Sequence, residues 1–136
     1  MIIVLDTNVL ISGILKPYSK AATVLRLLAD GTIQLAYDLR LLSEYRDVLN
    51  RPKFNFAKEN VEGFLEQTEK EGLLVSVKPL KFHLPDPDDE PFLEVALSGV
   101  VKAIVTGNKR HFPKKEYEGV KILSPAEFLE AVKEKI

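Results

Sequence analysis

The sequence predicts an α/β domain of three layers, in which a mostly parallel central sheet carries helices on both faces. Short apolar runs of strand length alternate along the chain with longer segments of helical periodicity. This alternation is typical of parallel sheets whose strands are connected by helices. The first run, residues 2–5, is apolar at every position. A strand of this kind is buried on both faces, as strands of parallel sheets are.

The first half of the chain divides into elements at residues that stop or start helices. Asp38 can cap a helix that runs to about Asn50, because the Arg51-Pro52 pair would stop it. Glycines 31 and 72 lie just past the ends of two other helical segments, where glycine is favoured. The remaining elements expected here are a strand at 2–5, helices at 9–15 and 21–28, a strand at 33–36 and a helix at 58–70.

The second half contains one segment rich in proline and acid, from Pro79 to Pro91. Proline disfavours helix in the residue before it and cannot donate to a sheet, so this segment predicts an extended connector. Ser124 can cap the closing helix. The elements expected around the connector are strands at 73–77, 103–105 and 121–123 and helices at 92–97 and 125–135.

The composition is that of an ordinary globular protein. The chain has 136 residues, 46% of them hydrophobic and 29% charged, so we expect a single domain over residues 1–136. The absence of cysteine excludes disulfides and thiolate zinc sites, and we expect a cytoplasmic location. A formal net charge of −1 means that any binding of nucleic acid must be local.

Polar residues follow two of the predicted strands directly. The triplet Asp6-Thr7-Asn8 follows the strand at 2–5, and Thr106-Gly107-Asn108 follows the strand at 103–105. Open parallel sheets bind ligands outside the carboxyl ends of their strands. The amide oxygen of Asn108 could ligate a hard cation or orient its water. Alternatively, Asp6 only caps the next helix, and residues 106–108 form a plain β-turn.

Glu44 is a second candidate acid. At helical periodicity it lies about 40° from Val48, at the margin of an apolar stripe, whereas Asp47 lies about 100° away and is expected to face water. A carboxylate at the edge of a core is costly unless a cation or a hydrogen-bond donor meets it. The alternative is a surface ion pair with Arg40, four residues earlier.

Four acids lie between Asp86 and Glu90, just before the helix expected near Pro91. Acids are favoured in a first helical turn, which accounts for some of them. Four within five positions exceed what capping requires, and a divalent cation would relieve their repulsion. The basic run Lys109-Arg110-His111 is either a solvated loop or a phosphate contact beside the metal.

Taken in order, these motifs resemble the PIN-domain family over nearly the whole chain. The ending at residues 120–128, with Ser124-Pro125, is similar to the VapC-type toxin branch of that family. The resemblance implies a Mg²⁺- or Mn²⁺-dependent nuclease that acts on RNA, with an antitoxin and a second copy of the chain as partners. The segments that carry the resemblance are residues 4–10, Glu44, Asp89 with residues 92–96, and residues 105–108.

The resemblance also implies roles for particular residues. Asp6, Glu44 and Asp89 match the acids that hold the metal, with Asp86 as the alternative to Asp89. Asn108 occupies a catalytic position where many members have a further Asp, so one-metal chemistry is expected. Residues implied to position these groups are Thr7, Asn8 and Thr106, and residues implied to contact the RNA backbone are Lys109 and Arg110.

Other functions remain as alternatives. A phosphatase with Asp6 as nucleophile would require a second Asp at position 8, where Asn8 stands. A catalytically weak or inactive PIN fold that binds RNA is favoured by Asn108, and metal-dependent cleavage would distinguish it from the enzyme. Leu25 and Leu28, on an early helix, could serve a dimer or the core, and we expect the core.

Overall fold

The computed structural model describes residues 1–134, and within them the strands form one six-stranded sheet of order β3-β2-β1-β4-β6-β5. All neighbouring strands are parallel except β5 and β6. The predicted fold class, a mostly parallel sheet in an α/β domain, is therefore confirmed. The strands are β1 Ile2–Leu5, β2 Gln34–Tyr37, β3 Leu73–Leu74, β4 Ala103–Val105, β5 Glu116–Tyr117 and β6 Val120–Leu123.

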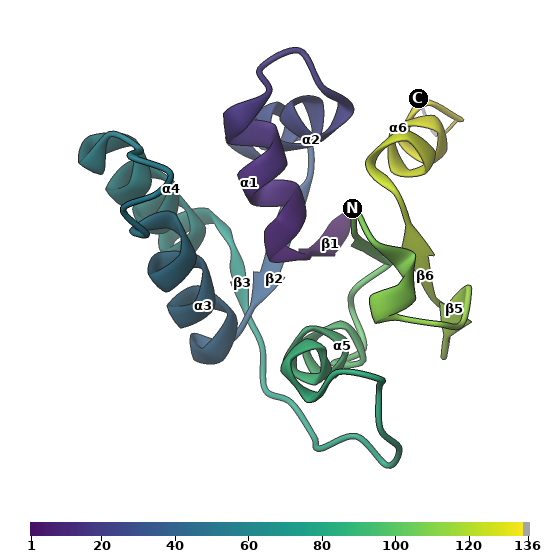
Figure 1. Cartoon of the computed structure of the whole chain (residues 1–136). Coiled ribbons are helices and arrows are strands. Elements are labelled where there is room, and N and C mark those ends of the chain that lie inside the picture. Colours follow the sequence, from purple (N-terminus) through teal and green to yellow (C-terminus); the bar gives the residue numbers. More distant parts are fainter. Residues whose placement is uncertain (135–136) are drawn as a thin grey trace.

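The helices cover both faces of this sheet. Figure 1 shows α1, α2 and α6 above the sheet, α5 below it, and α3 with α4 beside its β2–β3 end. The α-helices are α1 Thr7–Leu15, α2 Lys20–Ala29, α3 Leu39–Leu49, α4 Lys58–Glu71, α5 Glu90–Ala96 and α6 Pro125–Glu134. Two short 3₁₀ helices are η1 Pro87–Asp89 and η2 Lys109–His111.

Most helix boundaries follow from the capping residues in the sequence. The Asp38 carboxylate accepts a hydrogen bond from the Leu41 backbone N–H at 3.1 Å and so caps α3, as predicted. Gly31 follows α2 with a φ of 82°, a conformation that glycine adopts without strain. The closing helix α6 is also confirmed, although Lys135, its expected last residue, lies outside the described residues.

Two parts of the sheet differ from the expectation. The strand expected at 73–77 is only Leu73–Leu74, because its partner β2 ends at Tyr37, directly before the cap of α3. Strand β5 was not predicted. It forms a hairpin with β6 through Glu118 and Gly119, which both have positive φ, 49° and 89°. A two-residue loop of this kind matches the twist of an antiparallel pair.

The core lies between the sheet and its helices and includes all of β4 and residues 3–5 of β1. Tyr45 is completely buried, and its hydroxyl donates to the Leu5 carbonyl at 2.5 Å, which ties α3 to the end of β1. Leu25 and Leu28 are half-buried and pack against this core, in agreement with the structural role expected for them.

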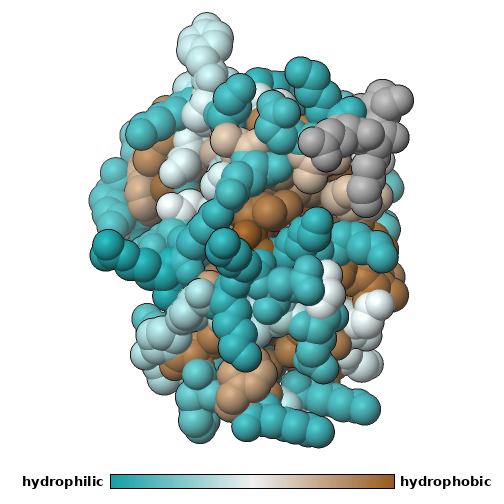
Figure 2. All heavy atoms as spheres, turned by 90° about the vertical axis from the view of Figure 1, so that its right-hand side faces the viewer, coloured by the Kyte–Doolittle hydropathy of each residue, from teal (hydrophilic) through white to brown (hydrophobic). Residues whose placement is uncertain are grey.

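The surface of the β6 and α6 side is mainly hydrophilic. Figure 2 shows this face, on which hydrophobic atoms are visible in separate areas between polar side chains. Within residues 1–134, no helix is both long and apolar enough to cross a membrane.

Candidate metal centre

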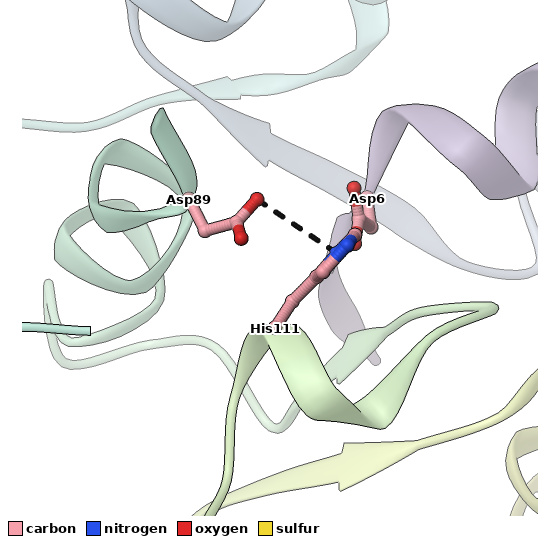
Figure 3. A group of neighbouring side chains, drawn as sticks. All are labelled: Asp6, Asp89 and His111. Atoms are coloured by element: carbon pink, nitrogen blue, oxygen red, sulfur yellow. Dashed lines mark hydrogen bonds and ion pairs between the residues drawn. The ribbon is translucent and has the colours of Figure 1, made fainter. Parts of the chain in front are cut away.

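Three side chains from distant parts of the chain, Asp6, Asp89 and His111, point toward one another at the carboxyl ends of β1 and β4 (Figure 3). Each offers one potential metal-ligand atom, and these atoms all lie within 4.8 Å of one another. Both carboxylates are buried and the imidazole is half-buried. Asp6 follows β1, Asp89 ends η1 and His111 ends η2.

Asp6 is held by Val105, the last residue of β4, and by Thr106, which follows that strand. The Asp6 backbone N–H donates to the Val105 carbonyl at 2.9 Å. The Thr106 hydroxyl, which is completely buried, donates to Oδ2 of Asp6 at 2.8 Å. Asp6 occupies the N-cap position of α1, but its carboxylate makes no capping hydrogen bond within the described residues. The alternative that Asp6 only caps a helix is therefore wrong, and the carboxylate faces the cluster.

Asp89 carries a carboxylate oxygen without a partner. The residue is only 8% exposed, and among residues 1–134 its Oδ2 atom has no hydrogen-bond partner. Burial raises the pKa of Asp89 to about 6, opposed by the nearby His111 and reinforced by the charges of Asp6, Asp86 and Asp88. A buried carboxylate oxygen of this kind is costly to leave unpaired, and a cation would satisfy it.

His111 lies between the two carboxylates. Its Nδ1 atom is 2.8 Å from Oδ2 of Asp6 and 3.7 Å from Oδ1 of Asp89. Burial alone would lower the pKa of His111, but the hydrogen bond to Asp6 and the two carboxylate charges outweigh it and raise the pKa above 6.5. The Nδ1 atom of His111 therefore lies close to both carboxylates, where a metal ion could be shared by all three side chains.

The structure places Glu44 beside this cluster rather than in it. Its Oε2 atom accepts a hydrogen bond from the Thr7 hydroxyl at 3.2 Å. The side chain is exposed, so the expectation that Glu44 lies along the edge of the core is wrong. The alternative pairing with Arg40 is also wrong, because Arg40 pairs with Asp38 and Glu94. The metal-binding role of Glu44 remains a prediction.

Two other predicted residues act as caps of 3₁₀ helices. Asp86 is exposed, and its Oδ1 accepts from the Asp88 backbone N–H at 2.9 Å, so Asp89 and not Asp86 enters the cluster. Asn108 is also exposed, and its Oδ1 accepts from the Arg110 backbone N–H at 3.1 Å. Its Nδ2 lies 3.4 Å from Nε2 of His111.

Asn8, one of the residues predicted to position the site, connects the segment after β1 to the segment after β4. The Asn8 side chain accepts a hydrogen bond from the Gly107 backbone N–H at 3.0 Å. A Cβ on Gly107 would lie 3.4 Å from Oδ1 of Asn8, an ordinary van der Waals contact, so the two loops approach closely here without excluding a side chain. Lys109 forms an ion pair with Glu127 of α6, whereas Arg110 is exposed beside the cluster.

His111 is the site residue that the sequence did not reveal, because it was interpreted as part of a basic run. Its place in the cluster depends on the short turn of η2, in which the His111 backbone N–H donates to the Asn108 carbonyl at 3.1 Å, and the sequence carries no clear signal for this turn.

The donor set fits a divalent metal ion. Two carboxylates and one imidazole converge, and the unpaired oxygen of Asp89 supplies a ligand that no protein donor satisfies within residues 1–134. The fold and the cluster thus define an α/β protein with a metal-compatible acidic site at the carboxyl ends of its parallel strands.

Comparison with known families agrees with this class. A PIN-domain family model matches residues 2–110, and the chain belongs to the PIN-domain family. PIN domains are generally metal-dependent nucleases, so the fold is of a nuclease type. None of the curated proteins compared with the chain matches it.

Proposed function

We propose that this protein is a divalent-metal-dependent endoribonuclease that hydrolyses phosphodiester bonds of single-stranded RNA. The observation that supports this most directly is the convergence of Asp6, Asp89 and His111, with one buried carboxylate oxygen left unpaired among the described residues, in a chain of the PIN-domain family. A site that concentrates negative charge in this way requires a cation before a phosphate can approach.

In the proposed mechanism, Asp6 and Asp89 are the central metal ligands. When bound, Mg²⁺ or Mn²⁺ would supply a water of lowered pKa and stabilise charge on the phosphate. The chain itself orients Asp6 through the Thr106 hydroxyl and the Val105 carbonyl. It holds Asp89 on the turn of η1, which Asp86 caps by accepting from the Asp88 backbone N–H.

Exposed residues around the cluster would position the substrate. Glu44 is exposed and accepts a hydrogen bond from Thr7, the residue next to Asp6, and we propose it as a further catalytic carboxylate. Arg110 is exposed and free to contact an RNA phosphate, whereas Lys109 would first have to exchange its partner Glu127. Contacts of this kind orient the backbone without reading its sequence.

We further propose that the protein is a cytoplasmic toxin of a toxin–antitoxin pair and functions as a homodimer. The support is the similarity of residues 120–128 to the VapC-type branch. Expression of the protein alone in a bacterial host would test the toxin role. We expect the wild type to arrest growth and Asp6→Asn not to do so. Normal growth on strong expression of an active enzyme would contradict the toxin role.

The enzymatic proposal is tested with purified protein, a labelled unstructured RNA, and Mn²⁺, Mg²⁺ or chelator. Cleavage should require metal and be lost in Asp6→Asn. Asp47→Asn is a matched control, because Asp47 is an exposed acid on α3 whose pairing with Arg51 is at the surface. Full activity of Asp6→Asn would overturn the proposed site.

Asn108 favours a second candidate function, an inactive PIN fold that binds RNA. Its side chain contacts the Arg110 backbone and lies near His111, so it adds no carboxylate to the cluster. Such a module should bind RNA equally well with and without Mn²⁺ and should never cut it. Metal-dependent cleavage in the assay above would exclude this candidate.

A further inference from the structure

The position of His111 has a consequence for the choice of metal. Two donors at right angles on an ion with ligand distances of about 2.1 Å lie about 3 Å apart, and opposite donors lie about 4.2 Å apart. The Nδ1 atom of His111 is 2.8 Å from Asp6 Oδ2 and 3.7 Å from Asp89 Oδ1, which is within this range. The donor oxygens of Asp6 and Asp89 lie within 4.8 Å of each other, so the three donors could surround one ion after a small closing movement.

The imidazole is also held in place by its surroundings. The His111 backbone N–H donates to the Asn108 carbonyl, which fixes the turn of η2 that carries the ring. The next residue, Phe112, is buried, and its ring meets the His111 ring edge-on at 6.2 Å between centroids. A side chain fixed in this way is preorganised as a ligand.

We propose that His111 is a nitrogen ligand of the metal through Nδ1 and that it makes the centre select Mn²⁺ over Mg²⁺. This inference rests on the proposed function, since it concerns the metal of the same site. Mg²⁺ favours an octahedral shell of oxygen ligands and water, whereas imidazole suits transition-metal ions. With two carboxylates and one imidazole, the chain offers a mixed donor set that suits Mn²⁺ better.

The competing account is that His111 serves only as a cation in the metal-free protein and moves aside when a metal binds. Under that account its removal would relieve competition for both metals alike, so the ratio of the two affinities would stay the same. A ligand role predicts instead that removal changes the ratio itself. The two accounts are therefore separated by binding measurements without RNA.

The test is calorimetric titration of Mn²⁺ and Mg²⁺ into the wild type, His111→Gln and His83→Gln. The chain has two histidines, and His83 is an exposed control that faces Glu90. We expect the wild type to bind Mn²⁺ at least about tenfold more tightly than Mg²⁺. His111→Gln should reduce this ratio about tenfold or more, because an oxygen replaces the nitrogen donor, and His83→Gln should leave it unchanged. An unchanged ratio in His111→Gln would overturn the proposal.

A second measurement needs no substitution and so does not depend on the folding of a variant. Electron spin-echo spectra of the wild type with bound Mn²⁺ should show modulation from a directly bonded ¹⁴N nucleus. That modulation should change to the ¹⁵N pattern when the histidines alone are labelled with ¹⁵N. A spectrum without nitrogen coupling would refute the ligand role. Either result is independent of whether the protein cleaves RNA, so failure of the nuclease proposal is recognised separately.

Discussion

Removal of the Asp89 charge should stabilise the metal-free protein, although it should also weaken the metal centre. Asp89 is buried, its Oδ2 lacks a partner among residues 1–134, and its pKa is raised from an ordinary 3.8 to about 6. The folded protein therefore carries an ionised carboxylate at pH 8 that would be better solvated in the unfolded chain. Asp89→Asn keeps the shape of the side chain and removes this cost.

The magnitude follows from the shift in pKa. A shift of about two units corresponds to about 3 kcal/mol, at about 1.4 kcal/mol per unit, which is an upper limit. Solvent on the open side of the site screens the charge, and loss of the attraction to His111 at 3.7 Å offsets part of the gain. We expect Asp89→Asn to raise the free energy of unfolding at pH 8 by about 1–2 kcal/mol.

The free energy of unfolding of the metal-free protein should fall as pH rises. A carboxyl group whose pKa is raised by folding costs stability as pH rises from 3.8 to about 6, so the advantage of Asp89→Asn should grow across this window. His111, whose pKa is also raised, loses its stabilising effect as pH rises above 6.5. Both groups therefore make the metal-free wild type less stable at pH 8 than at pH 5.

Urea unfolding in chelator at pH 5 and pH 8 would measure these effects. Asp47→Asn is the control, because Asp47 is an exposed acid on α3 that does not perturb Asp89, and it should change stability by less than about 0.5 kcal/mol. In saturating Mn²⁺ the wild type should become more stable than Asp89→Asn, because binding of the ion adds more to the free energy of unfolding of the wild type than to that of the variant. The reasoning is refuted if Asp89→Asn is less stable than the wild type at pH 8 in chelator.

Two further variants test how the ends of β1 and β4 support the site. Thr106→Val removes the hydroxyl that donates to Asp6, so the Mn²⁺ affinity measured by calorimetry should fall about 10- to 100-fold. Thr106→Ser keeps a hydroxyl and should keep the affinity of the wild type. Equal Mn²⁺ affinities of Thr106→Val and the wild type would contradict the positioning role of Thr106. Tyr45→Phe leaves the buried Leu5 carbonyl without its donor and should lower the free energy of unfolding by about 1–2 kcal/mol in urea. Unchanged stability would show that water replaces the hydroxyl.

Much of the fold could be predicted because its signals are local. The apolar run at residues 2–5 coincides with β1, and Asp38 caps α3 through the hydrogen bond that its position predicts. Strand β5 carries no such signal, since two residues are too few to show alternation. Its pairing with β6 depends on the backbone of Glu118 and Gly119, and glutamate rarely adopts a positive φ.

The candidate site was only partly predictable because it depends on contacts between distant segments. Asp6 could be identified from its place after a strand, whereas Asp89 was chosen among four clustered acids only through the resemblance to the PIN-domain family. Glu44 was placed wrongly, because helical periodicity puts it at the margin of the apolar stripe and cannot decide to which side it turns. His111 enters the cluster only through the turn of η2, which local composition does not predict.

The cluster joins residues that are far apart in the order of synthesis. Asp6 and His111 are separated by 105 positions, and Thr106 by 100. A ribosome adds about 5–20 residues per second, so roughly 5–20 s pass between the first and the last of these side chains. A nascent chain that ends before η2 contains neither the imidazole nor the complete turn after β4. The cluster can therefore assemble only after residue 111 has been synthesised, although the first of its side chains is made 105 positions earlier.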